Sequence, residues 1–322
     1  MNVYHFGCTA TWSEGPPSDL PKTEEEALAH IDELYQSGVP FFTKEMMRSA
    51  MKEIRRPLTN KDKVHLKDMN GAVVAYQMDL GNIEEFPNSD DSKRELEYLL
   101  TSAVIEYNCR AEMRHSIFWQ GYDPKIPYFC PLSISNNASV RDKATKEMVA
   151  FPAALPDEVS GYFKEDLDAW NKTEMCSNVK RILNSAAKHL EIKKVVAVSL
   201  DSVSRYREWE REWKQEGRNG YQHGLALTLR DWVKEKNSGA DVPCFLQDPA
   251  YLDPDKEVLP EYGFQIVDDP EAWLEMDDFS VVISISSNVP TKEIIADLAR
   301  PAVVICDRID NEDYDKRCGG SV

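Results

Sequence analysis

The most constraining feature of this chain is a series of short, apolar, β-branched runs that alternate with helical segments in its C-terminal half. The runs are residues 193–200, 242–246, 264–267, 279–285 and 302–306. Unbroken apolar runs of this length are typical of strands that are buried on both faces of a parallel sheet. The segments between them have helical apolar spacing: residues 223–236, 255–262, 271–276 and 291–298. The alternation predicts βαβ units and therefore an α/β domain with a Rossmann-like parallel sheet.

The N-terminal half predicts a less regular arrangement of helices. Residues 23–35 begin with Thr23 and an acidic first turn, a pattern that favours a helix ending near Gly38. A second helix is expected after Thr43. Helical apolar spacing over residues 89–107 predicts a third helix, which is longer than the first two.

A β-hairpin is also expected in the N-terminal half. The pair Asn70-Gly71 lies between two apolar runs and predicts a hairpin over residues 63–79. We therefore expect two parts. An irregular α+β region that carries the hairpin, residues 1–175, packs on the core, and a Rossmann-like domain with an acidic tail comprises residues 176–322.

The net charge restricts the partners of the protein. The formal net charge is -18, and phosphate binding requires clustered Lys and Arg, so no DNA-binding surface is expected. A local basic patch remains compatible with this charge, either in residues 180–194 or in residues 205–218, where Trp209 and Trp213 lie among Arg and Lys. The alternative for residues 205–218 is a solvated amphipathic helix.

The cysteines and the hydropathy give the expected compartment. The chain has 7 cysteines and no Cys-x-x-Cys pair, which argues against a disulfide framework or a zinc ribbon. We expect no metal and no cofactor. No apolar run reaches the roughly 18 residues of a membrane helix, and the N-terminal residues do not resemble a secretory signal. These features favour a cytoplasmic protein without a membrane partner.

Candidate functional residues follow the first predicted strand of the parallel sheet. Ligands of such sheets bind at the carboxyl ends of the strands, and this strand ends in SLDSVS, residues 199–204. The segment lacks G-x-G-x-x-G, and the chain contains no P-loop sequence, so neither dinucleotide nor P-loop phosphate binding is expected. Ser202 and Ser204 are candidates for a nucleophile, and Asp201 for binding a polar ligand. Turn and N-cap roles are the alternative.

The next predicted helix opens at the same edge with GYQHG, residues 220–224. His223 and Tyr221 could therefore face the same site, and a neutral imidazole there could accept a proton from an amine or a hydroxyl. The alternative for His223 is a structural role at the helix start.

Acidic residues follow the next two predicted strands. Asp248 lies after the second, and Asp268, Asp269 and Glu271 lie after the third. Carboxylates repel anions but bind a guanidinium through paired hydrogen bonds. The pattern favours a cationic ligand, with ordinary helix capping as the alternative.

Four segments together carry a family resemblance: KKVVAVSLDSVS, YQHGLALTLRDWV, CFLQDPAYLDPDKEVLPEYGFQIVDD and VVISISSNVPTKEI. Through them, residues 193–307 resemble the sensitivity-to-red-light-reduced-like domain. The plant-type members of that family are regulators in light and clock signalling, so this resemblance by itself implies no chemistry.

With its N-terminal region, SGVPFFTKEM included, the chain is also similar to fungal arginine-containing cyclodipeptide synthases of secondary metabolism. Those enzymes take amino acids from aminoacyl-tRNAs, arginyl-tRNA among them, and condense arginine with a second residue into a diketopiperazine. Their paired-aspartate motif with a nearby glutamate corresponds here to Asp268, Asp269 and Glu271, with the glutamate closer to the pair than expected.

This resemblance implies roles for the candidate residues. Ser202 or Ser204 would accept or orient the first aminoacyl group, and His223 or Tyr221 would relay the amine proton. The residues expected to bind the substrate are Asp201, Asp248, Asp268, Asp269 and Glu271, together with Ser287 and Asn288, whose neighbouring N–H groups would stabilise an oxyanion. The residues expected to bind tRNA are Arg205, Arg207, Arg211 and Lys214.

Two other functions stay open. In a non-enzymatic regulatory protein of the same family, the acidic strand ends would only cap helices. An unrelated small-molecule transferase or ligand-binding protein could use the same edge of the sheet.

Overall fold

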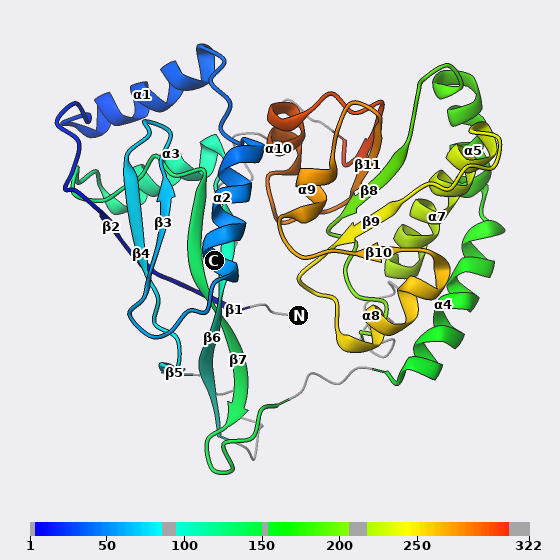
Figure 1. The fold of residues 1–322 in the computed structure, drawn as a ribbon, viewed down its shortest axis with the longest axis horizontal. Coiled ribbons are helices and arrows are strands. Elements are labelled where there is room, and N and C mark those ends of the chain that lie inside the picture. The colour runs from blue at the N-terminus through cyan, green and yellow to red at the C-terminus, as the bar shows by residue number, and fades with distance from the viewer. Residues whose placement is uncertain (1–3, 86–94, 150–153, 206–217, 309–322) are drawn as a thin grey trace. The chain divides into compact units, whose positions relative to one another are not determined.

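The fold is that of a mixed α/β protein with one parallel and two antiparallel sheets, as Figure 1 shows. In this computed structural model the described residues are 4–85, 95–149, 154–205 and 218–308. The chain divides into two compact units. The first contains Met1–Ala150, Lys292–Asp297 and Ile309–Val322, and the second contains Phe151–Thr291 and Leu298–Arg308. The predicted division between residues 175 and 176 stays a prediction.

The first unit contains the two antiparallel sheets. One has the order β1-β7-β6-β5 and the other has the order β2-β4-β3. The strands are β1 (Tyr4–Gly7), β2 (Thr9–Trp12), β3 (Lys63–Lys67), β4 (Val73–Gln77), β5 (Ile83–Glu85), β6 (Leu96–Tyr107) and β7 (Leu132–Asp142).

The helices of the first unit begin where their caps predict. Helix α1 (Glu24–Gln36) begins after Thr23, whose Oγ1 accepts a hydrogen bond of 3.2 Å from the Glu26 N–H. Helix α2 (Lys44–Arg55) begins in the same way after Thr43, which accepts from the Met46 N–H at 3.1 Å. Each threonine satisfies one of the free N–H groups at a helix start. A third helix, α3 (Arg110–Gln120), follows β6.

The predicted hairpin is confirmed, since β3 and β4 pair antiparallel on either side of Asn70-Gly71. The turn is longer than a two-residue connection. The Asp68 N–H donates to the Ala72 carbonyl at 2.9 Å, and Gly71 alone of this pair has a positive φ, of 84°. The Asp68 carboxylate also accepts from the N–H groups of Asn70 and Ala72, which fixes the turn.

The helix predicted over residues 89–107 is wrong for the described part of that range. Residues Leu96–Tyr107 form β6, which pairs with β7 along its whole length and with β5 near its start. The apolar residues happen to recur at helical spacing, but pairing on both sides buries them as a strand instead. Local propensity is a weak guide where such tertiary pairing is available. Residues 89–94 lie outside the described part of the chain.

The second unit is built on a five-stranded parallel sheet with the order β10-β9-β8-β11-β12. The strands are β8 (Lys194–Val198), β9 (Cys244–Gln247), β10 (Gln265–Ile266), β11 (Ser280–Ser284) and β12 (Val303–Cys306). All five predicted strands are confirmed. The chain moves outward from β8 to β10 and then returns to β11, on the other side of β8, so the strand order reverses between β8 and β11.

Helices alternate with these strands. They are α7 (Arg218–Lys236), α8 (Asp253–Val258), the 3₁₀ turn η2 (Leu259–Tyr262), α9 (Glu271–Glu275) and α10 (Thr291–Leu298). The sheet is preceded by α4 (Pro156–Asn171), α5 (Glu174–Ile182) and the π-helical turn η1 (Leu183–Ala187). The predicted helices are therefore confirmed, although α7 begins at Arg218 rather than at the predicted position.

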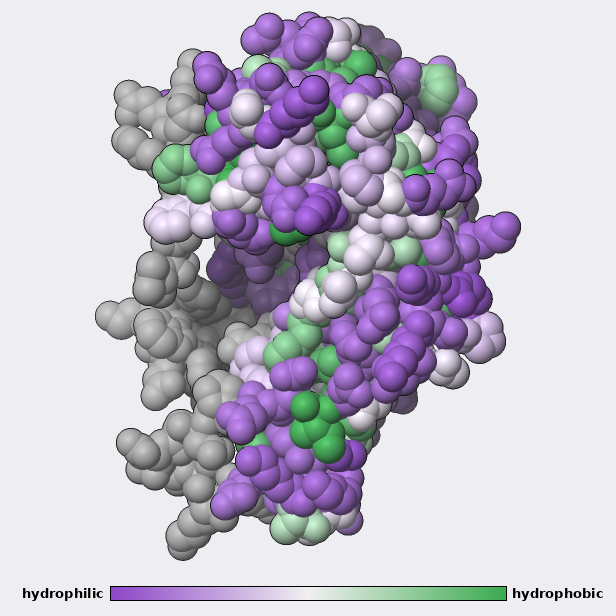
Figure 2. All heavy atoms as spheres, turned by 90° about the vertical axis from the view of Figure 1, so that its left-hand side faces the viewer, coloured by the Kyte–Doolittle hydropathy of each residue, from purple (hydrophilic) through white to green (hydrophobic). Residues whose placement is uncertain are grey.

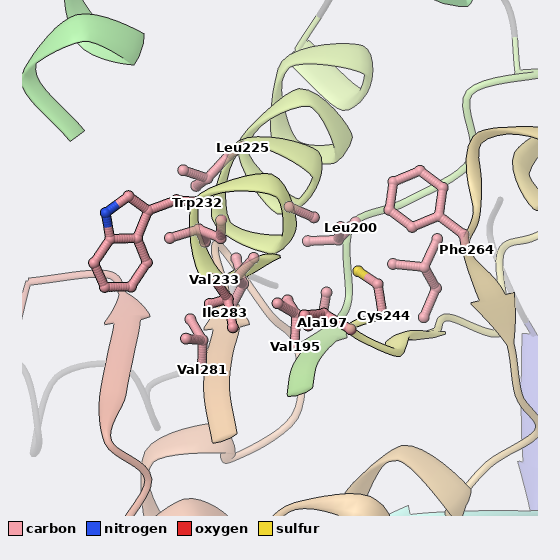
Figure 3. Close-up of a cluster of buried hydrophobic side chains, with 14 of the residues drawn as sticks. Val195, Ala197, Leu200, Leu225, Trp232, Val233, Cys244, Phe264, Val281 and Ile283 are labelled. Atoms are coloured by element: carbon pink, nitrogen blue, oxygen red, sulfur yellow. The ribbon is translucent and has the colours of Figure 1, made fainter. Parts of the chain in front are cut away.

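Burial on both faces explains why these strands read as unbroken apolar runs. Figure 3 shows Leu225 and Val233 of α7 against Val195 and Ala197 of β8, within one buried cluster. The alternate residues of β8 face the other side, where α9 packs on β8 and β9. All residues from Val195 to Val198 are at most 1% exposed.

Two glycines allow α4 to pack closely on α7. A Cβ added to Gly224 would lie 2.8 Å from the Trp170 ring, and one added to Gly220 would overlap the Asp166 side chain. Because both pairs are four residues apart, the two glycines lie on one face of α7, opposite one face of α4. The Trp170 indole N–H also donates to Thr228 at 2.9 Å, which fixes the contact.

The coloured part of the face that Figure 2 shows is largely hydrophilic, with hydrophobic residues in small separate groups. Among the residues described, no helix has both the length and the apolar content that a membrane crossing requires.

Candidate functional site

The carboxyl ends of β8 and β11 carry unusual backbone conformations. Ser199 and Asp201 after β8 have φ values of 59° and 61°, and Ser286 after β11 has a φ of 56°. Among the described residues other than glycine, these are three of the six with positive φ. Such residues cost of order 1–3 kcal/mol each and are concentrated at functional sites. The two loops are joined by a hydrogen bond of 2.9 Å from the Ser287 hydroxyl to the Ser199 hydroxyl.

Leu200 explains how the first loop is held in this conformation. Its side chain is fully buried in the cluster of Figure 3, between the two residues of positive φ. The backbone therefore turns on either side of an apolar anchor, and Asp201 is left at the surface, where 49% of its side chain is exposed.

A buried carboxylate, Asp255 of α8, fixes the rest of this loop. Its Oδ2 accepts from the hydroxyls of Ser202 and Ser204 at 2.7 and 2.8 Å. Its Oδ1 accepts from the N–H groups of Val203 and Ser204 at 2.9 and 2.8 Å. Asp255 and Ser202 are fully buried, and Ser204 is 2% exposed. These hydrogen bonds hold the loop in place. They point the hydroxyls of both predicted nucleophiles, Ser202 and Ser204, into the protein.

His223 lies in the first part of α7 and is fully buried. Its Nδ1 is 2.7 Å from the Asn219 carbonyl, and its Nε2 is 2.9 Å from the Tyr251 hydroxyl. The carbonyl can only accept, so Nδ1 carries the proton and Nε2 accepts from Tyr251. Burial lowers the pKa of His223 to about 4, so the imidazole is neutral near pH 7.

Asp248, at the carboxyl end of β9, also contacts the first loop. It accepts from the Asp201 N–H at 2.6 Å and from the Ala250 N–H at 2.8 Å. Burial raises the pKa of Asp248 to about 6, and the two N–H groups oppose that rise. The structure thus brings together the predicted residues Asp201 and Asp248.

The acidic group after β10 is organised by a residue that the sequence analysis did not single out. Gln247 donates from Nε2 to Asp269 at 2.6 Å and accepts at Oε1 from the Ala272 N–H at 2.8 Å. The Glu271 carboxylate accepts from the Asp268 N–H at 3.1 Å, across the turn that precedes α9. The substrate-binding role of Asp268, Asp269 and Glu271 stays a prediction.

The remaining predicted residues are placed less centrally. The Tyr221 ring lies against Trp170 at 6.0 Å between centroids, on the side of α7 that faces α4. Asn288 is exposed. Arg205 has its Nη1 at 3.4 Å from Asp201, whereas Arg207, Arg211 and Lys214 lie outside the described residues.

Sequence reasoning overlooked the roles of Asp255, Tyr251 and Gln247. Gln247 and Tyr251 lie within the segment that follows the apolar run of β9, so a polar residue at a strand end was a usable signal for them. No local pattern indicates that Asp255 reaches a loop about fifty residues earlier in the chain. Within the described ranges, no cluster of His, Cys, Asp and Glu is arranged to hold a metal ion.

Comparison with known proteins identifies only the second part of the chain. No curated protein and no solved structure matches the chain. Residues 173–318, which contain the parallel sheet and its carboxyl-edge loops, match the SRR1 domain, and this confirms the resemblance of that part to the sensitivity-to-red-light-reduced-like domain.

Proposed function

We propose that the protein is an aminoacyl-tRNA-dependent cyclodipeptide synthase that condenses arginine with a second amino acid. The observation that carries the proposal is the group of left-handed residues at the carboxyl ends of β8 and β11. These strands flank the reversal of strand order, which is where Rossmann-like sheets bind their ligands. We accordingly treat the sheet as Rossmann-like and its carboxyl edge as the substrate site.

The charge of this edge suits a cationic substrate. Asp201 presents a half-exposed carboxylate. The carboxylate of Asp248 is next to it, because it accepts a hydrogen bond of 2.6 Å from the Asp201 N–H. A guanidinium could bind Asp201 through paired charge-assisted hydrogen bonds. Because the pKa of Asp248 is about 6, this carboxylate adds its negative charge only above that pH.

The reaction requires no oxidant or reductant. The amine of one aminoacyl group attacks the ester carbonyl of the other, an amide forms, and one tRNA leaves as its free hydroxyl. The second amine then attacks the remaining ester, which closes the ring and releases the second tRNA. Since both esters are already activated, positioning can supply much of the rate, on the order of 7–11 kcal/mol in favourable systems.

The geometry favours direct transfer over a covalent step on serine. Ser202 and Ser204 donate their hydroxyl protons to Asp255 inside the protein. An acyl group on either oxygen would break this anchor and would require space in a buried region. We therefore assign these serines to the support of the loop.

An Asp201→Asn variant tests the site. Asparagine retains an oxygen for the Ser202 N–H, which donates to Asp201 at 2.7 Å, but it loses the charge. We expect the KM for arginyl-tRNA in diketopiperazine formation to rise about tenfold or more, because a charge-assisted bond is lost. Asp241→Asn is the matched control, because Asp241 is exposed just before β9, at the opposite end of the strand. Equal kinetics for both variants would remove Asp201 from the site.

One observation favours the regulatory alternative. The most conspicuous functional groups, on Ser202, Ser204 and His223, are buried and bonded within the fold. A regulatory protein needs no accessible nucleophile or base. It predicts a stable protein partner and no cyclic dipeptide from any pair of charged tRNAs.

A further inference from the structure

Two buried polar atoms in the described part of the chain have no hydrogen-bonding partner: Nη2 of Arg205 and Oε1 of Gln222. Buried polar groups are nearly always bonded, and each one left unbonded costs about 1–3 kcal/mol. One of these atoms is a donor and the other is an acceptor, yet they do not bond each other. Their opposite chemistry needs an explanation.

The position of Gln222 follows from the apolar stripe of α7. Leu225, Ala226 and Leu229 belong to the buried cluster that faces the sheet. Gln222 lies three, four and seven residues before them, so it continues the same face of the helix. Asn219, one turn before Gln222 in α7, donates to the Ser202 carbonyl at 2.8 Å, so Gln222 lies near the loop at the carboxyl end of β8, and it is only 8% exposed. It is a polar residue at the end of a stripe that is otherwise apolar.

Arg205 is held at the same edge by the anchored loop. Its N–H donates to the Ser202 hydroxyl at 3.1 Å, and that hydroxyl is bonded to Asp255. The side chain is 16% exposed, and its Nη1 lies 3.4 Å from Asp201. The backbone and one arm of the guanidinium are therefore fixed, while Nη2 is buried without a hydrogen-bond partner, near the carboxylates of Asp248 and Asp255.

We propose that Arg205 and Gln222 together recognise the aminoacyl group of the substrate. In this arrangement Arg205 Nη2 donates to the acyl oxygen, and Gln222 Oε1 accepts from the neighbouring α-ammonium group. An α-aminoacyl ester carries this acceptor and this donor on adjacent carbons, whereas a simple anion or a simple amine satisfies only one of the two residues. The inference rests on the proposed function, because that function supplies an aminoacyl ester as the ligand.

Calorimetric titration of the full chain with arginine methyl ester tests the pair. Gln222→Leu removes the acceptor in a side chain of similar size, so it should weaken binding about 10- to 100-fold. Its melting temperature should stay the same or rise, because an unbonded buried oxygen is replaced by an apolar group. Gln222→Glu retains an acceptor at the same point and should retain binding. Gln36→Leu, on exposed helical surface, is the control for the substitution type.

Three results would overturn the inference: no binding of the ester by the wild-type protein, unchanged affinity in Gln222→Leu, or equal loss in Gln222→Leu and Gln222→Glu. Different results would overturn the inference and the proposed function. Diketopiperazine formation that is equally fast in the wild type and in Gln222→Leu overturns only the inference. Gln222-dependent ester binding by a protein that forms no diketopiperazine overturns only the proposed function.

Discussion

At the scale of single residues, the carboxyl edge of the parallel sheet has buried groups that hold its loops and an exposed group that we propose binds the ligand. Asp255 accepts hydrogen bonds from the buried hydroxyls of Ser202 and Ser204, whereas the side chain of Asp201, in the same loop, is half exposed. The sequence indicated that Asp201, Ser202 and Ser204 lie at this edge, because they follow a strand in a parallel sheet. It did not indicate which of them are buried, because burial here depends on the distant carboxylate of Asp255.

Substitution of Ser202 by alanine distinguishes support from nucleophilic catalysis. We expect Ser202→Ala to lower the free energy of unfolding by about 1–3 kcal/mol, because Asp255 loses a buried donor and the N–H groups of Ser204 and Arg205 lose their acceptor. The kcat of diketopiperazine formation should stay within a fewfold of the wild-type value. Urea denaturation and steady-state kinetics on the same preparation check both expectations, with Ser204→Ala as the companion variant. Complete loss of activity at unchanged stability would instead identify Ser202 as the nucleophile.

The pKa values of His223 and Asp248 predict two opposing effects of pH on stability. The pKa of His223 is about 4 in the fold and 6.5 when unperturbed, so the unfolded chain binds more protons between these values and stability falls as pH falls. The pKa of Asp248 is about 6 in the fold and 3.8 when unperturbed, so there the folded chain binds more protons and stability rises as pH falls. Each effect has an upper limit of about 3 kcal/mol.

These effects nearly cancel in the wild-type protein between pH 6 and pH 4. Asp248→Asn removes one of them, so its free energy of unfolding should fall more steeply over this range than that of the wild type. Urea denaturation at several pH values measures the difference in slope. Parallel curves for the two proteins would contradict the burial of Asp248.

At the scale of elements, the strands of the second unit were predictable because both of their faces are buried. Their apolar runs leave little ambiguity, and the Asp and Ser residues that follow them mark the loops. Strand β6 was not predictable, because the residues of LEYLLTSAVIEY also match helical spacing and only pairing with β7 and β5 decides between the two. The close packing of α4 on α7 was also missed, although the four-residue spacing of Gly220 and Gly224 signals it.

Glycine substitutions in these two helices should have opposite effects. Gly224→Ala places a methyl group 2.8 Å from the Trp170 ring, so we expect a loss of about 1–3 kcal/mol of stability from overpacking. Gly161→Ala lies within α4 with no atom near the new methyl group, so we expect a gain of about 0.5–1 kcal/mol from helix propensity. Chemical denaturation of both variants gives the comparison. Equal effects would mean that α4 and α7 do not approach as closely as described.

At the scale of the whole molecule, the acidic composition and the site are consistent with each other. A net charge of -18 disfavours general binding of nucleic acid, yet it suits an edge that attracts a cationic amino acid. Two units of similar size share the chain, and the SRR1 match at residues 173–318 lies almost wholly on the second of them. Composition and strand pattern were enough to predict the parallel sheet. Composition and strand pattern could not indicate the chemistry at the edge of this sheet, because that chemistry depends on which polar groups remain without hydrogen bonds after folding.

The central claim is that this protein joins arginine to a second amino acid taken from charged tRNA. The most direct measurement incubates the purified full chain with arginyl-tRNA and, in turn, with tRNAs charged with each other amino acid, and analyses the products by mass spectrometry. We predict an arginine-containing diketopiperazine that forms only when arginyl-tRNA is present and that is absent with uncharged tRNA and free amino acids. The absence of any cyclic dipeptide in every combination would contradict the account.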